Sequence, residues 1–208
     1  MDRIKQDPPT KTQFCNYVRT KITVFHERQL RNDAYKNSKM RFLNVSVSGL
    51  SGRHHPALLN IMTSQDVNKM RPHIKMLCSD LYTYELKAKY NGGSPHCILC
   101  QEPSENKENK ENIIHILTSC KAYTTVRIKI LEEMKTVVKC SKSALNFDHI
   151  EDNPERLTQF ILDCTSLNLP MRINNCDDTC LKIFKLSRDL CNSINRTRLE
   201  DLKNLQKS

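Results

Sequence analysis

Three cysteines and one histidine lie close together in the middle of the chain. Two residues separate Cys97 from Cys100, fourteen separate Cys100 from His115, and four separate His115 from Cys120. Zinc binds four ligands tetrahedrally, and thiolate sulfur with imidazole nitrogen is a preferred donor set in structural sites. Four protein ligands leave no open coordination position for water. The pattern therefore predicts one structural Zn²⁺ and no hydrolytic metal.

The spacing within each pair suits a shared ion. A tight turn at Cys97 and Cys100 can direct both sulfurs to one point, and a short helical turn can present His115 and Cys120 together. A redox pair is one alternative, but it needs a βαβ context, whereas the neighbouring segments are predicted to be helical. Unrelated buried thiols are another, because free cysteine is a good core residue. Glycine and proline near Cys97 indicate a loop and disfavour a core helix.

The spacer between the two ligand pairs contains a repeated triplet, "ENKENKEN". Without two copies of the triplet, an eight-residue spacer, "QEPSENII", would remain. Closure entropy depends only logarithmically on loop length, so growth of the loop from eight to fourteen residues costs about 0.5 kcal/mol. Structural zinc contributes roughly 10–16 kcal/mol in small finger peptides. We therefore expect the site to tolerate this insertion.

Apolar residues at helical spacing surround the cluster and predict a mainly α fold, with a small CCHC zinc knuckle inserted between helices. A single weak extended segment is expected where Leu43, Val45 and Val47 alternate with polar residues. Helices are predicted over residues 14–35, 67–90, 126–140 and 154–163, and from a cap at Asp177 or Asp178 through Ile194. Pro72 is expected to start or kink the second of these helices.

These elements divide the chain into five expected regions. The regions are a flexible arm over 1–12, a basic helical region over 13–95, the zinc knuckle with its following helix over 96–140, a helical tail over 141–200, and a frayed end over 201–208.

The composition favours an intracellular protein with a polyanionic partner. The formal net charge is +10, and excess Lys and Arg attract nucleic acid in particular. A solvated basic surface without a partner is the alternative. We expect no membrane span, because no run of about 18 apolar residues exists. Ten cysteines without an apolar leader at the N-terminus indicate a reducing compartment, the nucleus or the cytoplasm.

With the spacer shortened, the ligand pattern reads C-x2-C-x8-H-x4-C and is followed by Tyr123 and Arg127. This pattern resembles the zinc-binding region at the C-terminal end of non-LTR (LINE-like) retrotransposon reverse transcriptases. The segments "SPHCILCQEPSEN" and "IIHILTSCKAYTTVR" carry the most specific part of the resemblance. A weaker likeness extends over most of residues 40–200, including "QFILDCTSLNLP" and "LSRDLCNSINRTR".

The resemblance implies that Cys97, Cys100, His115 and Cys120 are the metal ligands. It also implies a functional aromatic and basic pair at Tyr123 and Arg127, and a polymerase domain in a parent protein. Lys121 departs from the family, which often has proline there. No polymerase carboxylate pair is evident, because Asp177 and Asp178 fit a helix cap better. The chain is therefore expected to be a non-catalytic fragment or remnant.

RNA, or single-stranded or target DNA, is the expected partner. Basic side chains would neutralise phosphates, and Tyr84, Tyr90 or Tyr123 would either stack on bases or pack internally. The candidate contact residues are Lys69, Arg71, Lys75, Lys87, Lys89, Lys121, Tyr123, Arg127 and Lys129. The alternative function is a zinc-stapled helical adaptor that binds protein. Two other patterns have no evident partner: the His54–His55 pair, interpreted as incidental, and Cys176-x3-Cys180, interpreted as lying near a helix start.

Overall fold

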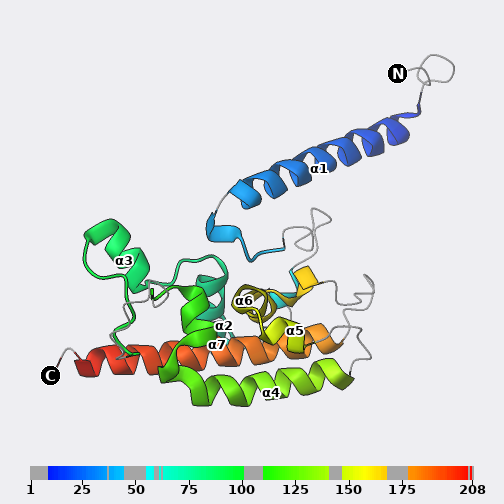
Figure 1. Ribbon diagram of the computed structural model, residues 1–208. Coiled ribbons are helices and arrows are strands. Elements are labelled where there is room, and N and C mark those ends of the chain that lie inside the picture. Colours follow the sequence, from blue (N-terminus) through cyan, green and yellow to red (C-terminus); the bar gives the residue numbers. More distant parts are fainter. Residues whose placement is uncertain are drawn as a thin grey trace.

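The computed structural model describes residues 9–36, 38–44, 55–58, 61, 63–100, 110–140, 147–167, 178–205 and 207 (Figure 1). Over these residues the fold is mainly helical, as predicted. The described β structure is one isolated antiparallel bridge between His96 and Lys110. Leu43 and Asn44 belong to no strand, and the rest of the expected extended segment, including Val45 and Val47, lies outside the described residues.

The long helix α7 (Asp178–Leu205) organises the body of the molecule. Helices α2 (Ser64–Leu77), α4 (Thr124–Cys140) and α6 (Pro154–Leu162) all pack against α7 (Figure 1). Met76, Met134, Phe160 and Ile183 from these four helices are completely buried. Each such side chain contributes roughly 1.5–3 kcal/mol on burial, so the contacts among these helices account for much of the stability of the fold.

The prediction of one helix over residues 67–90 is wrong, because this segment forms two helices. Helix α2 ends at Leu77, and α3 begins at Tyr84 and ends at Asn91. Ser79 adopts a φ of +49°, and the N–H of Asp80 bonds to the carbonyl of Lys75, which is the pattern of a Schellman C-cap. Pro72 lies inside α2 and does not start a new helix.

The helices after the cysteine cluster follow the predicted order. Pro154 occupies the first turn of α6, and the side chain of Asn153 accepts hydrogen bonds from the first N–H groups. A short helix that was not predicted, α5 (Asp148–Glu151), precedes α6. Phe147 and Ile150 are buried there, and this burial anchors α5 beside α6.

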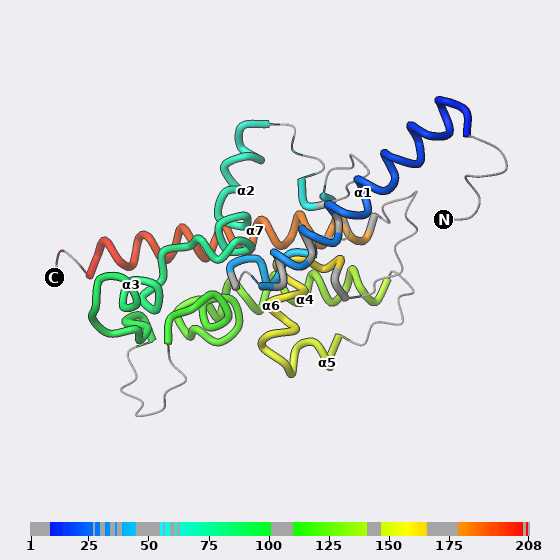
Figure 2. The backbone as a smooth tube through the Cα atoms, turned by 90° about the horizontal axis from the view of Figure 1, so that it is seen from above, coloured from blue at the N-terminus to red at the C-terminus, as the bar shows by residue number. Residues whose placement is uncertain are grey.

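Helix α1 (Lys11–Lys36) confirms the first predicted helix but stands away from the body (Figures 1 and 2). It contacts the 3₁₀-helix η2 (Ser38–Met40) that follows it. Phe14, Ile22 and Phe25, which form an apolar stripe at helical spacing along α1, are exposed. The periodicity of that stripe therefore predicted the helix but not its burial.

Helix α7 begins at Asp178, whereas Asp177 and Cys176 lie outside the described residues. The helix continues to Leu205, so residues 201–205 are helical where a frayed end was expected. The other proposed region boundaries stay predictions. None of the described helices combines the length and the apolar character needed to cross a membrane.

Candidate metal centre

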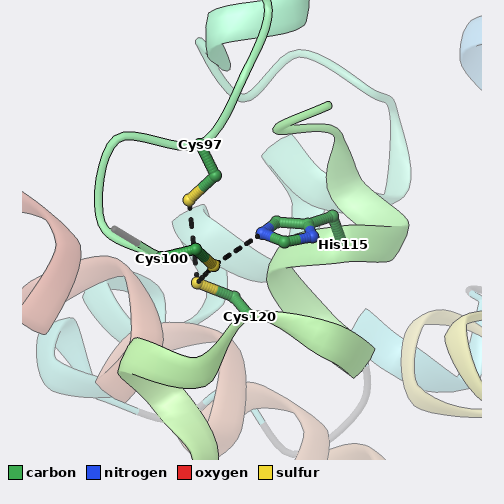
Figure 3. A group of neighbouring side chains, drawn as sticks. All are labelled: Cys97, Cys100, His115 and Cys120. Carbon is green, nitrogen blue, oxygen red and sulfur yellow. Dashed lines mark hydrogen bonds between the residues drawn. The ribbon is translucent and has the colours of Figure 1, made fainter. Parts of the chain in front are cut away.

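The four side chains predicted as ligands converge on one point (Figure 3). One possible ligand atom from each of Cys97, Cys100, His115 and Cys120 lies within 4.8 Å of all the others. Cys97 and Cys120 have their sulfurs 3.8 Å apart, and Cys100 and Cys120 have theirs 3.5 Å apart. The Nε2 atom of His115 is 3.3 Å from the sulfur of Cys100.

These separations fit ligands that share a tetrahedral ion. With Zn–S bonds of about 2.3 Å, two sulfurs on one zinc ion lie about 3.8 Å apart. A disulfide would bring two sulfurs to about 2.05 Å, and Cys97, Cys100 and Cys120 are all free thiols. The residues present therefore fit one metal ion held by three sulfurs and one imidazole nitrogen.

The first ligand pair is held by a turn after α3. Gly92 and Gly93 have φ values of +73° and +101°, which residues with a side chain rarely adopt. Beyond them, the N–H of Glu111 donates to the carbonyl of Pro95 at 2.8 Å, beside the bridge between His96 and Lys110. These contacts close the base of the ligand loop. Residues 101–109, which carry most of the triplet repeat, lie outside the described residues.

The second ligand pair depends on a π-helix, η4 (His115–Ser119). In an α-helix, residues five apart point about 140° away from each other. In η4 the N–H of Cys120 instead bonds to the carbonyl of His115 at 2.7 Å, and this wider turn brings both side chains to one side. The side chain of Asn112 accepts from the N–H of His115 at 2.9 Å and so fixes the start of η4.

The thiols influence one another's ionisation. The pKa of Cys97 is held well below its usual range, because the Cys120 thiol donates a hydrogen bond to it. For the same reason the pKa of Cys120 is raised far above its usual range, and burial raises that of Cys100. The protein alone thus favours one thiolate and disfavours a second and a third. A cation bound among the three sulfurs would offset the repulsion between neighbouring thiolates and so favour their ionisation.

Tyr123 and Arg127 lie inside the protein and do not form an outer edge. Tyr123 is 1% exposed and Arg127 is 7% exposed. The Nη2 atom of Arg127 donates to the carbonyl oxygen of Cys120 at 3.1 Å and to the hydroxyl of Thr124 at 3.3 Å. Burial lowers the pKa of Arg127 and raises that of Tyr123. Neither side chain is accessible to nucleic acid in this structure, and Arg127 instead supports a ligand residue.

A buried ion pair, absent from the sequence predictions, joins the centre to the end of α7. The Nε atom of Arg198 lies 2.7 Å from a carboxylate oxygen of Glu111, and both side chains are buried. Arg198 also donates to the carbonyl of Tyr82, and the other oxygen of Glu111 accepts from the N–H of Tyr84. Glu111 therefore connects the ligand loop to α3 and α7.

The lysine and arginine candidates have varied surroundings. Lys69 pairs with Asp189 at 2.9 Å and is only partly exposed. The remaining candidates are exposed, and they are Arg71, Lys75, Lys87, Lys89, Lys121 and Lys129. They come from α2, α3 and α4 and from the short helix η5 (Lys121–Tyr123) after the last ligand.

His55 and Cys180 also have partners that the sequence did not reveal. The Nε2 atom of His55 lies 3.2 Å from a carboxylate oxygen of Asp163, and both side chains are buried. The interpretation of His55 as incidental is therefore corrected, because it ties residues 55–58 to the end of α6. His54 lies outside the described residues. Cys180 is buried and hydrogen-bonds with Cys164, so it has a thiol partner other than Cys176.

Comparison with models of protein families, with curated proteins and with solved structures gives no match for this chain. The geometry therefore supports a candidate metal site on its own, and the family assignment stays a prediction.

Proposed function

We propose that this chain is a zinc-stabilised nucleic-acid-binding module without chemistry of its own, similar to the C-terminal region of a non-LTR reverse transcriptase. Its ion is Zn²⁺, because a tetrahedral set rich in thiolate favours zinc over harder divalent ions. The role of the ion is structural, since four protein ligands fill its coordination shell. Because four protein ligands would surround the ion, the contacts with nucleic acid would come from exposed side chains.

The observation that carries this proposal is the surface of α3. None of its residues is buried, and Tyr90 within it and Tyr82 just before it are 66% and 55% exposed. The ammonium of Lys89 lies 5.7 Å from the ring centre of Tyr90. Exposed aromatic rings interleaved with lysines are typical of surfaces that stack on unpaired bases and neutralise their phosphates. The proposed interface is therefore Tyr82, Lys87, Lys89 and Tyr90.

The metal would fix this surface in place. The end of α3 leads through Gly92 and Gly93 directly to Cys97, and its start is held by Glu111, four residues before His115. Both ends of α3 are thus connected to ligand residues over short distances along the chain. Loss of the ion is expected to release α3 and to weaken binding of nucleic acid.

Fluorescence anisotropy with labelled single-stranded RNA and DNA over a salt series tests the proposal. We expect micromolar or tighter binding that weakens steeply with salt. Tyr90→Ala is expected to weaken binding by about 1–3 kcal/mol, or roughly 5- to 150-fold. Lys139→Ala, at the opposite end of α4 from the metal centre, is the control and should bind as the wild type does. Absence of binding at low salt would exclude the proposed function.

A protein-binding adaptor is the second candidate, and α1 favours it. Phe14, Tyr17, Ile22 and Phe25 are exposed on a helix that stands apart from the body (Figure 1). Clustered exposed apolar residues often mark protein–protein contacts. In this case nucleic acid would not bind, and Phe25→Asp would abolish association with a protein partner while leaving the metal content unchanged.

A further inference from the structure

A hollow of about 340 Å³ lies between α2 and α7, away from the metal ligands and from α3. Figure 2 shows α2 meeting α7 near the middle of α7. The polar residues that line the hollow are Asp66 and Lys69 from α2, and Lys182, Lys185, Arg188 and Asp189 from α7. Four basic side chains thus face two acidic ones, so the lining of the hollow has an excess of positive charge.

Both acidic residues already have partners within the protein. The carboxylate of Asp66 accepts from the N–H and the hydroxyl of Thr63, which completes the capping box at the start of α2. Asp189 pairs with Lys69 at 2.9 Å. Each carboxylate therefore already has a partner other than Arg188.

Arg188 is the residue that needs an anion. Its side chain is 7% exposed, and its Nη1 atom is buried without any hydrogen-bond partner. A buried charged donor without a partner is costly, and a guanidinium group bonds phosphate oxygens especially well because its donors match their geometry. Lys185 is exposed on the preceding turn of the same helix, three residues away, and adds a second cation at the rim.

We propose that this hollow is a phosphate-binding site in which Arg188 and Lys185 hold the oxygens. The phosphate belongs to the backbone of a nucleic acid strand or is a free phosphate. The first source rests on the proposed function, and the second does not. Because the hollow lies outside the α3 interface, it would add a separate contact to the same ligand.

Thermal unfolding of the full zinc-loaded chain in inorganic phosphate tests the site without nucleic acid. At constant ionic strength, phosphate is expected to raise the midpoint temperature of unfolding of the wild type above its value in chloride. Arg188→Met is expected to lose this rise while keeping the stability measured in chloride, because it removes an unpartnered buried charge. Lys185→Gln tests the rim without altering a buried residue and should reduce the rise. Lys203→Gln, near the end of the same helix, should keep it.

No rise for the wild type, or the same rise in Lys185→Gln, would overturn the phosphate site and leave binding through α3 unaffected. Anisotropy with single-stranded RNA then identifies the source. If the phosphate belongs to a nucleic acid strand, Lys185→Gln weakens RNA binding. It also lowers, by about one, the steepness with which the logarithm of the binding constant falls against the logarithm of the salt concentration. If RNA binding is unchanged while the phosphate-induced rise is lost, the site holds a free phosphate. Absence of RNA binding in the wild type, with the rise intact, would exclude the proposed function alone.

Discussion

Arg127 donates a hydrogen bond from its Nη2 atom to the backbone carbonyl of Cys120, one of the four candidate ligands, at 3.1 Å. This contact gives a structural role to a basic residue that the sequence alone suggested was an external contact. It places a fixed positive charge next to the thiolates and orients the chain that carries the last ligand.

Arg127→Met is expected to weaken zinc binding roughly 10- to 100-fold, as substitutions around metal ligands commonly do. It should also lower the free energy of unfolding by about 1–3 kcal/mol, because the carbonyl of Cys120 loses its charged donor. Competition with a chelating dye measures the affinity, and urea unfolding measures the stability. The control is Lys129→Met, an exposed position on the same helix. An affinity unchanged by Arg127→Met would exclude the supporting role.

The buried pair of Glu111 and Arg198 is expected to be highly sensitive to single substitutions. Glu111→Gln leaves the guanidinium of Arg198 buried without a counter-charge, which typically costs about 3–5 kcal/mol. Arg198→Met in the same chain should recover much of this loss. Urea unfolding of both single variants and of the double variant measures the coupling. Asp148→Asn, at an exposed carboxylate that pairs with the partly buried Lys135, is the control and should have a much smaller effect. Additive losses at positions 111 and 198 would contradict a direct pairing.

His73 predicts the direction of one pH dependence. Burial lowers its pKa from 6.5 to about 4, while its Nε2 atom bonds to the carbonyl of Leu162 at 2.9 Å. Between these two values the unfolded chain binds a proton that the folded chain does not. The free energy of unfolding therefore falls as pH falls from 6.5 towards 4.

His73→Gln keeps a donor for Leu162 and removes this titration. Its loss of stability between about pH 7 and about pH 5 should be smaller than that of the wild type by about 2 kcal/mol. Urea unfolding at both pH values provides the comparison, and both proteins share the protonation of the metal ligands. Parallel losses in the two proteins would show that His73 does not cause the effect.

Removal of the ion is expected to act first on α3. Because both ends of this helix connect to ligand residues, its amide protons should exchange faster after treatment with a chelator, as should those of residues 113–119. The amides of α2 should keep more of their protection, because α2 packs against α7 with Met70 and Met76 buried. Hydrogen exchange followed by mass spectrometry measures both regions. Equal exchange rates in α3 with and without the ion would show that the ion does not hold α3 in place.

The sequence predicted those features that depend on local spacing. The ligand set, α1, α4 and α6 follow from patterns within at most 26 residues of chain. The end of α2 was missed because Ser79 adopts a positive φ without the glycine that usually marks it. The burial of Arg127 was missed because spacing shows which residues share a face, whereas tertiary packing decides which face is covered.

Pairings distant in sequence could not be predicted. Glu111 lies 87 residues from Arg198, and His55 lies 108 residues from Asp163. No local pattern links such residues, because their contact depends on how the helices pack around α7. Arg188 similarly resembles any other arginine on a helix until its burial is known. The sequence thus located the candidate metal ligands but not the network around them.

Native mass spectrometry of the reduced, zinc-reconstituted full chain tests the central claim most directly. The account predicts the mass of the polypeptide with one zinc ion, and loss of that ion in Cys97→Ser but not in Cys15→Ser, which alters an exposed thiol outside the centre. A wild-type chain that carries no metal, and that unfolds at the same urea concentration with or without a chelator, would contradict it.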